Sequence, residues 1–260
     1  MSVDLSVVVP VFEGANLIGP GIALLEEALA KRPGSWEIVV VDDGSRDDTA
    51  ARVPVSDRTR LVRLLENRGK FGALKAGMAA ARGHCRIFTD ADVPYDLEAL
   101  AYIESLVNGH GFHVVVGDRT LDASAETERR PWPRAAASVV FTALVRLFVT
   151  GGLFDTQCGL KGFRGDVADL LFPLLTVEGF AGDVELLYIA LKYNLELRRI
   201  PVRLRRHEAS TVRFGAHAPE MLREVLRLRG KWVQGLYESE GLRRLAAQAY
   251  WAAAAPGTAA

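Results

Sequence analysis

Cysteine is scarce in this chain. Its 260 residues include only Cys85 and Cys158, which are too few for a disulfide framework. No pair of cysteines or histidines has the spacing typical of a zinc site. The N-terminus lacks a basic region followed by an apolar core, so we expect no signal peptide. These absences indicate a reducing compartment and therefore a cytoplasmic location.

An excess of charge is also lacking. Thirty-two basic side chains balance 32 acidic ones, so the net charge points to no particular partner, and we expect no nucleic-acid ligand. The distribution is nevertheless uneven. Residues 192–231 hold eleven Lys/Arg and four Asp/Glu, so this stretch carries about +7 and the remainder about −7.

Long apolar runs are limited to one segment, residues 135–154. Its length matches the ~20 residues of a membrane span. However, Arg146 lies inside it and Gly151 and Gly152 interrupt its end. The composition favours a helix packed on the core or lying against a membrane surface.

Strand-like and helix-like patterns alternate through the first half. Continuous apolar runs, typical of strands buried on both faces of a parallel sheet, lie at 5–12, 36–45, 60–66, 85–92 and 112–117. Helical patterns lie between them, at 18–29, 71–83 (closed by Gly83) and 96–109 (capped by Asp96). This alternation predicts an α/β fold with a mostly parallel central sheet flanked by helices. We expect one domain over residues 1–229, followed by a C-terminal helical extension and tail over 230–260.

Acidic residues follow three of the predicted strands. Glu13 follows the first, Asp42 and Asp43 the second, and Asp90 and Asp92 the third. Ligands of open parallel sheets bind beyond the carboxyl ends of the strands, so these acids should gather along one edge. Clustered carboxylates repel one another unless a cation joins them. Oxygen ligands favour Mg²⁺ or Mn²⁺, although aspartates at strand ends are more often ordinary caps and turns.

Five motifs occur in this order: VVVPVFEGANL, IVVVDDGSRDDT, ENRGKFGALKAGMAAARG, FTDADV and DTQCGLKGFR. Together they resemble the family 2 glycosyltransferases, especially the polyprenyl-phosphate branch of dolichyl-phosphate glucosyltransferases and mannose synthases. The resemblance covers residues 3–228 and implies a single-domain GT-A fold. It also implies a nucleotide-diphosphate sugar donor, a divalent metal and inversion at the anomeric centre.

The resemblance implies a donor site near the first three strand ends. Asp90 and Asp92 would bind the ribose and the metal, and Asp42 the base or ribose. The full set of implied donor residues is Pro10, Phe12, Glu13, Asp42, Ser45, Lys70, Gly72, Asp90, Ala91 and Arg213. Arg213 belongs to the STVRF element, which resembles a basic loop that closes over the diphosphate. Ser45 and Lys70 have plainer alternatives, as a turn residue and a solvated charge.

The second half is expected to supply the acceptor side. The resemblance implies acceptor roles for Gln157 and Lys161, and arginine binds phosphate through its planar fork, so the acceptor candidates are Arg119, Arg129, Arg130, Arg134, Gln157 and Lys161. Asp183 and Asp92 are the candidate catalytic residues. Asp183 resembles the acid that faces the sugar. It would act as general base for a hydroxyl acceptor, orient the donor for a phosphate acceptor, or simply cap its helix.

Two departures from the family concern the metal and the membrane. Pro94 stands where many relatives carry a glutamine, which leaves the third protein ligand of the metal undefined. Residues 237–257 are too charged for the transmembrane helices with which many relatives continue. A stripe of Arg223, Arg227 and Lys231 fits either peripheral contact with an anionic membrane face or an ordinary packed helix.

The alternatives belong to other classes or to another acceptor. A Rossmann dehydrogenase needs G-x-G-x-x-G after its first strand, and PVFEGAN lacks it. A catalytically inactive nucleotide-binding module would be expected to lose Asp90, Asp92 or Asp183. The sequence therefore predicts a metal-dependent hexosyltransferase using UDP-glucose or GDP-mannose and a polyprenyl-phosphate acceptor. The alternative is an inverting transferase acting on a soluble hydroxyl acceptor, with Asp183 as general base.

Overall fold

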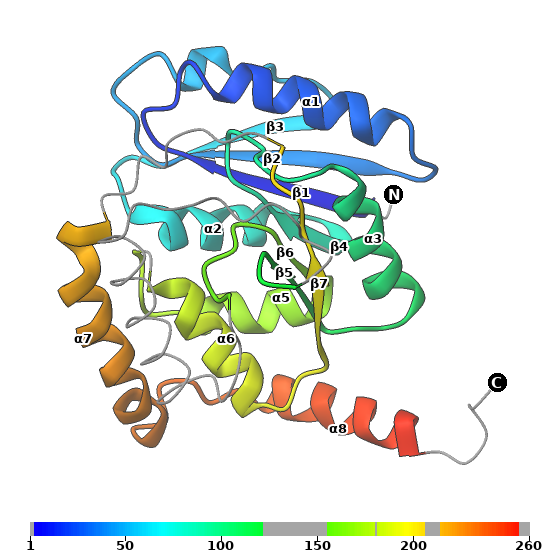
Figure 1. Cartoon of the computed structure of the whole chain (residues 1–260), viewed down its shortest axis with the longest axis vertical. Helices are drawn as coiled ribbons and strands as arrows, with labels where there is room; N and C mark the ends of the chain where they lie inside the picture. Colours follow the sequence, from blue (N-terminus) through cyan, green and yellow to red (C-terminus); the bar gives the residue numbers. More distant parts are fainter. Residues whose placement is uncertain (1–2, 122–154, 180, 206–213, 255–260) are drawn as a thin grey trace.

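A seven-stranded sheet forms the centre of the part of the chain that the computed structural model describes, residues 3–121, 155–179, 181–205 and 214–254 (Figure 1). The strand order is β3-β2-β1-β4-β6-β5-β7. Every neighbouring pair is parallel except those of β6, which is antiparallel to both β4 and β5. The predicted α/β fold with a mostly parallel sheet is confirmed. The strands are β1 (Val3–Val11), β2 (Trp36–Asp42), β3 (Thr59–Arg63), β4 (Gly83–Phe88), β5 (Val114–Asp118), β6 (Lys161–Arg164) and β7 (Leu197–Pro201).

Helices cover both faces of the sheet. On one face, α1 (Ile18–Ala30) and α3 (Glu98–Glu104) pack on the side chains of β1 that include Val7 and Val9. On the other, α2 (Gly69–Ala80), α5 (Gly165–Leu171) and α6 (Gly182–Lys192) form a core with Val8. Because alternate residues of β1 enter different cores, the strand has to be apolar along its whole length.

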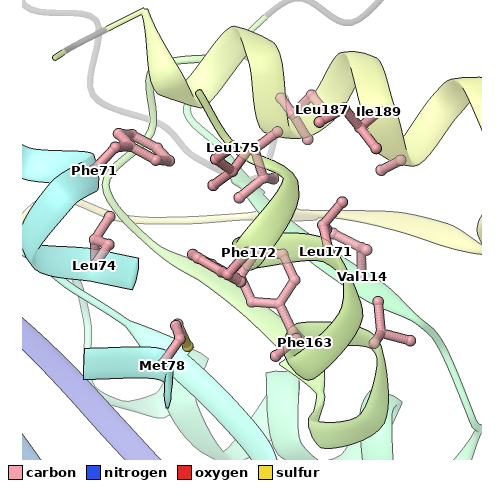
Figure 2. Close-up of a cluster of buried hydrophobic side chains, with 14 of the residues drawn as sticks. Phe71, Leu74, Met78, Val114, Phe163, Leu171, Phe172, Leu175, Leu187 and Ile189 are labelled. Atoms are coloured by element: carbon pink, nitrogen blue, oxygen red, sulfur yellow. The ribbon is translucent and has the colours of Figure 1, made fainter. Parts of the chain in front are cut away.

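The core on the α2 side holds the aromatic residues nearest to the site. Phe71 of α2 lies edge-on to Phe88 of β4, with ring centroids 6.3 Å apart, and Phe88 stacks on Phe163 of β6 at 6.0 Å. Figure 2 shows Phe71, Phe163 and Phe172 with aliphatic side chains from α2, α5 and α6. This packing fixes the starts of α2 and α6 against the end of β4.

Two further helices pack on this layer, one against α6 and the other against α5. They are α7 (Phe214–Val233) and α8 (Glu240–Ala254). Leu242 and Tyr237, both almost wholly buried, belong to the same core as α6. Residues beyond the predicted boundary at 229/230 therefore pack on the domain.

Several sequence expectations need correction at element ends. Gly83 does not close a helix; α2 ends at Ala80, and Gly83 is the first residue of β4. The predicted helix over 96–109 is α3 followed by a π-helical turn, Ser105–Gly109. Asp96 is not the N-cap, which is Leu97, although its carboxylate accepts the backbone N–H of Glu98.

The predicted apolar helix over 135–154 lies outside the described residues. Within the described segments, no helix combines the length and the apolar content needed to cross a bilayer.

Candidate active site

The carboxyl ends of β1, β2 and β4 meet at one edge of the sheet. Strand β1 lies between the other two, with Val11 paired to Asp42 and Val8 to Phe88. The acidic residues that follow β2 and β4 therefore flank the end of β1, as the sequence predicts. Pro10 lies in β1, while Phe12 and Glu13 follow it and are exposed.

One carboxylate oxygen of Asp42 is buried and accepts no hydrogen bond from the described residues. Its side chain is fully buried, and Oδ1 accepts the backbone N–H of Ser45 at 3.0 Å. Oδ2 lies 3.2 Å from Nε of Arg63, but without hydrogen-bond geometry. The Ser45 hydroxyl oxygen in turn accepts the backbone N–H of Glu13 at 2.9 Å. A buried acceptor without a donor is costly, so a bound donor group at Oδ2 would stabilise the site.

Asp43 joins this edge to the start of α2. Its carboxylate accepts the backbone N–H of Arg68 at 2.8 Å. Burial raises the pKa of Asp43, and the neighbouring charge of Asp42 adds to the rise, while the Arg68 hydrogen bond opposes it. Gly69, at φ +77°, follows Arg68 in the left-handed conformation that favours glycine.

Asp90 lies where β4, α2 and the segment before β6 converge. Its Oδ1 accepts a hydrogen bond from Nζ of Lys70 at 2.7 Å. Burial alone would lower the pKa of Lys70, but the charges of Asp90 and Asp183 raise it. Gly159 faces the other side of the carboxylate, and a Cβ at this position would overlap with Oδ2 of Asp90. The two predicted donor residues Lys70 and Asp90 are therefore brought together.

The segment Asp90–Asp92 is held in a strained turn. The backbone N–H of Val93 donates to the carbonyl of Asp90 at 3.0 Å. Val93 has a φ of +46°, which is unusual for a β-branched residue. Gly21 of α1 lies so close to the Ala91 carbonyl that a Cβ would overlap with it. Such strain persists where surrounding packing enforces it and is typical of functional sites.

Asp183 lies inside the protein, in the first turn of α6. Its Oδ1 is 2.5 Å from Nζ of Lys161, and both side chains are almost completely buried. Lys161 also donates to the carbonyl of Cys158 at 2.6 Å, and its Nζ lies 5.4 Å from the centroid of the Phe88 ring. Nζ of Lys70 lies 5.9 Å from the same ring. Two lysine–aspartate pairs therefore meet at Phe88.

Two glutamates that the sequence analysis missed organise the loop before α6. The carbonyl of Glu178 accepts the backbone N–H of Phe71 at 2.8 Å, and its carboxylate pairs with Arg68 at 2.5 Å. Glu185, fully buried, accepts the backbone N–H groups of Thr176 and Val177 and the hydroxyl of Tyr237. No local spacing signals the contacts of Glu178 with Arg68 and Phe71 or that of Glu185 with Tyr237, since these partners are distant in sequence.

The acceptor candidates are only partly described. Arg119 follows β5 and forms a bidentate ion pair with Asp155, with both N–O distances 2.7 Å. Burial would raise the pKa of Asp155, but the hydrogen bonds from Arg119 lower it. Gln157, two residues after Asp155 in the sequence, is partly buried. Outside the described residues lie Arg129, Arg130, Arg134 and Arg213.

The remaining predicted donor residues lie on the same elements. Gly72 is buried in the first turns of α2, and Ala91 and Asp92 are partly buried after β4.

Asp90 and Asp92 are the candidate ligands for a divalent metal at this edge. Among the described residues, no three His, Cys, Asp or Glu side chains gather closely enough to hold an ion by themselves. Asp90 and Asp92 are oxygen donors, and the ammonium of Lys70 on Asp90 shows that this position attracts a cation. Two carboxylates suit Mg²⁺ or Mn²⁺ when diphosphate oxygens and water complete the shell.

Comparison with known sequences identifies the family of this chain. A model of the family described as Glycosyl transferase family 2 matches residues 6–172. The dolichyl-phosphate β-glucosyltransferase of Dictyostelium discoideum is 30% identical over 252 residues, covering 91% of this chain and 77% of the relative. That of Drosophila melanogaster is 34% identical over 218 residues, covering 78% and 67%. The fold and the site thus define a glycosyltransferase. The chain belongs to glycosyltransferase family 2, as its motifs predict.

Solved structures show the same fold. Mannosyl-3-phosphoglycerate synthase from Rubrobacter xylanophilus has a TM-score of 0.65 at 17% identity, covering 92% of this chain and 77% of that one. Glucosyl-3-phosphoglycerate synthase from Mycobacterium tuberculosis, in complex with UDP, has a TM-score of 0.61 at 22% identity, covering 87% and 78%. The latter enzyme has also been solved with Mn²⁺ and UDP, with a TM-score of 0.58 at 21% identity and the same coverage. The GT-A fold expected from the sequence is confirmed.

Proposed function

We propose that this chain transfers a hexose from a nucleotide-diphosphate sugar to a polyprenyl phosphate, with a divalent metal and with inversion. The observation that carries the proposal is the meeting of two lysine–aspartate pairs, Lys70–Asp90 and Lys161–Asp183, at Phe88 of β4. The sequence likeness to dolichyl-phosphate β-glucosyltransferases over most of the chain supports a lipid-phosphate acceptor. It also favours UDP-glucose over GDP-mannose as the donor.

The donor would lie across the ends of β1, β2 and β4. Oδ2 of Asp42, buried and without a hydrogen-bond donor in the described part of the chain, suits an N–H of the base or a ribose hydroxyl. Asp90 and Asp92 would hold Mg²⁺ or Mn²⁺, which neutralises the diphosphate and stabilises it as a leaving group. Lys70, already bound to Asp90, adds a second cation at this point.

The chemistry follows from the charge of the acceptor. A phosphate monoester is already an oxyanion, so its oxygen attacks the anomeric carbon without losing a proton. The new bond forms opposite the diphosphate as the carbon–oxygen bond to the diphosphate breaks, which inverts the centre. Asp183 would orient the sugar rather than accept a proton.

Cations would hold the acceptor phosphate. We assign this role to Arg119, Arg129, Arg130 and Arg134, of which the structure describes Arg119. Its guanidinium is partly exposed and bound to Asp155. A phosphate would share or replace that carboxylate, because both are oxyanions that fit the arginine fork.

The α7 helix offers a surface for the membrane in which such an acceptor lies. Its outward face carries Leu226 and Val233, 55% and 85% exposed, and Leu236 follows the helix at 51%. Exposed arginines at 223, 227 and 229 lie on the same helix. Apolar side chains among cations suit an anionic lipid surface, and we propose peripheral contact there, at the inner face of the membrane.

A side-by-side acceptor assay tests the function. With UDP-glucose and Mn²⁺, we expect product from a polyprenyl phosphate and none from the free polyprenol. Equal glucosylation of the free alcohol, or of a soluble hydroxyl compound, would instead establish the alternative in which Asp183 is a general base.

A further inference from the structure

Lys161 is a charged side chain without access to water. Its exposed fraction is 0%, and it lies at the start of β6, between β4 and β5. Its described contacts are the carboxylate of Asp183, the carbonyl of Cys158 and the ring of Phe88. Buried ammonium groups are rare unless they are paired, because removing their hydration is costly. A lysine in this position needs its aspartate.

We propose that Lys161 is a positioning residue that holds Asp183 as a fixed, charged hydrogen-bond acceptor for the donor sugar and keeps it from accepting a proton. The inference deepens the proposed function and rests on it. It also gives Lys161 a role other than the direct acceptor contact that the resemblance implies.

The reason lies in the balance of two buried charges. A proton on Asp183 would leave the enclosed Lys161 ammonium without a charged partner in direct contact among the described residues, because Asp155, the other carboxylate on which its charge acts, is bound to Arg119. Breaking one partner of a buried pair is strongly unfavourable. Lys161 also occupies Oδ1 of Asp183 at 2.5 Å, which fixes the carboxylate. A general base has to accept the proton that this arrangement opposes. A phosphate acceptor requires no such base, so the pair fits an oxyanion acceptor.

Other charged groups near Asp183 leave Lys161 as its direct partner. Lys70 of α2 experiences the charge of Asp183 but is hydrogen-bonded to Asp90. Glu185, on the same helix, is bound by Thr176, Val177 and Tyr237. The Cys158 thiol is neutral, since burial raises its pKa to about 11.

The test compares four variants with the wild type. Lys161→Met keeps the length of the side chain and removes its charge. Asp183→Asn removes the carboxylate charge, and the double variant removes both. Lys75→Met is the matched control because, within the described part of the chain, the Lys75 ammonium donates to the backbone carbonyls of Leu175, at 2.6 Å, and Pro173, at 3.5 Å, rather than to a carboxylate.

Kinetics should separate positioning from acceptor binding. In Lys161→Met, the lone Asp183 carboxylate favours its protonated form. We expect kcat at neutral pH to fall by roughly tenfold to a hundredfold with little change in acceptor KM, and to recover as the pH rises. Asp183→Asn should lose activity without that recovery, and the double variant should match it. An unchanged kcat in Lys161→Met, or a pH-independent rise in acceptor KM alone, would overturn the proposal.

Thermal unfolding gives a readout that needs no acceptor. The Tm deficit of Lys161→Met should grow from pH 5 to pH 8, as the unpaired carboxyl must ionise, whereas that of the double variant and of Lys75→Met should stay constant. A constant deficit in Lys161→Met would sink the positioning role even if the wild type is active. A wild type that makes no polyprenyl-linked product would instead sink the proposed function and leave this unfolding result standing.

Discussion

At the scale of single residues, the site depends on a few close contacts around Asp90. Lys70 holds one oxygen of this carboxylate, Gly159 leaves space for the other, and Val93 closes the turn that follows. Each contact comes from a different part of the chain. Substitutions here should therefore affect ligand binding before they affect the fold.

Asp92→Asn tests the metal. The amide keeps the size of the side chain but removes the charge that a hard cation requires. We expect metal-dependent transfer to be lost and the Tm to stay near that of the wild type. Asp96→Asn, three residues beyond the turn, is the control and should remain active. Full activity of Asp92→Asn, or undiminished wild-type activity in EDTA, would contradict a metal at this position.

Gly159→Ala tests the space beside Asp90. The added methyl would overlap with Oδ2 of Asp90, so the carboxylate has to move. A displacement of 1 Å can cost ~10²-fold in rate, and we expect a loss of that order in kcat/KM for the donor. Gly109→Ala is the matched control, since nothing lies within 4 Å of a Cβ there. Wild-type kinetics of Gly159→Ala would show that Asp90 tolerates displacement.

His113 precedes β5, at the end of the sheet opposite to the candidate site. It should make the free energy of unfolding depend on pH. Burial lowers its pKa to about 4, and the charge of Arg164 adds to this. In the unfolded state the histidine has a pKa of ~6.5, so as the pH falls it takes up a proton before the folded state does. Stability should therefore be greatest above pH ~6.5 and fall as the pH drops towards 4.

Urea unfolding across this pH range checks the effect. His113→Asn offers an oxygen in place of Nδ1, which accepts the backbone N–H of Glu196, and should flatten the pH dependence. His84→Gln, at an exposed histidine, should leave it unchanged. A steep loss that persists in His113→Asn would assign it to other groups.

At the scale of elements, the sequence predicts the five strands of the first half and misses β6 and β7. Strands β1 and β2 contain long apolar runs because both of their faces are covered. Strand β7 reads Leu-Arg-Arg-Ile-Pro and lies at an edge, so its charged residues conceal it. Strand β6 has only four residues, two of them charged. Its position between β4 and β5 depends on contacts that no local pattern encodes.

The same division applies to the site. The positions of Asp42, Asp90 and Asp183 could be predicted, since strand ends and helix starts are visible in the sequence. The contacts that Asp90 and Asp183 make with β6 and the segment before it could not be predicted. Lys161 and Gly159 act on residues that are 22 and 69 positions away, and only the folded chain brings them together.

Glu185 of α6 should fix the positions of the loop before α6 and of the segment that follows α7. Glu185→Gln loses the charge that accepts two backbone N–H groups and the Tyr237 hydroxyl. We expect a loss of about 2–3 kcal/mol in the free energy of unfolding and weaker donor binding, because the loop also contacts the start of α2. Urea unfolding measures the first effect, and donor titration the second.

Glu240→Gln is the control for this prediction. Glu240 lies at the start of α8 and pairs with Arg243 and Arg244 at the surface, where such pairs contribute about 0–1 kcal/mol. If both variants lose the same stability, Glu185 has no special role.

At the scale of the whole molecule, the outward face of α7 should decide contact with lipid. We expect the protein to sediment with vesicles that contain anionic lipid, less so at high salt, and not with neutral vesicles. Substitution of Leu226 and Val233 by Glu should weaken this binding. Val55→Glu, at another exposed apolar side chain, should not. Equal binding of all three proteins would exclude α7 as the contact.

The position of β6 also affects how the protein is made. Strand β5 leaves the ribosome before β6, which follows about 40 residues later, yet β6 separates β5 from β4 in the finished sheet. At synthesis rates of about 5–20 residues per second, β5 waits several seconds for its neighbour with its backbone unpaired. During that interval it is an open strand edge, which invites aggregation. Growing chains that end before residue 161 are therefore the form of this protein most in need of a chaperone.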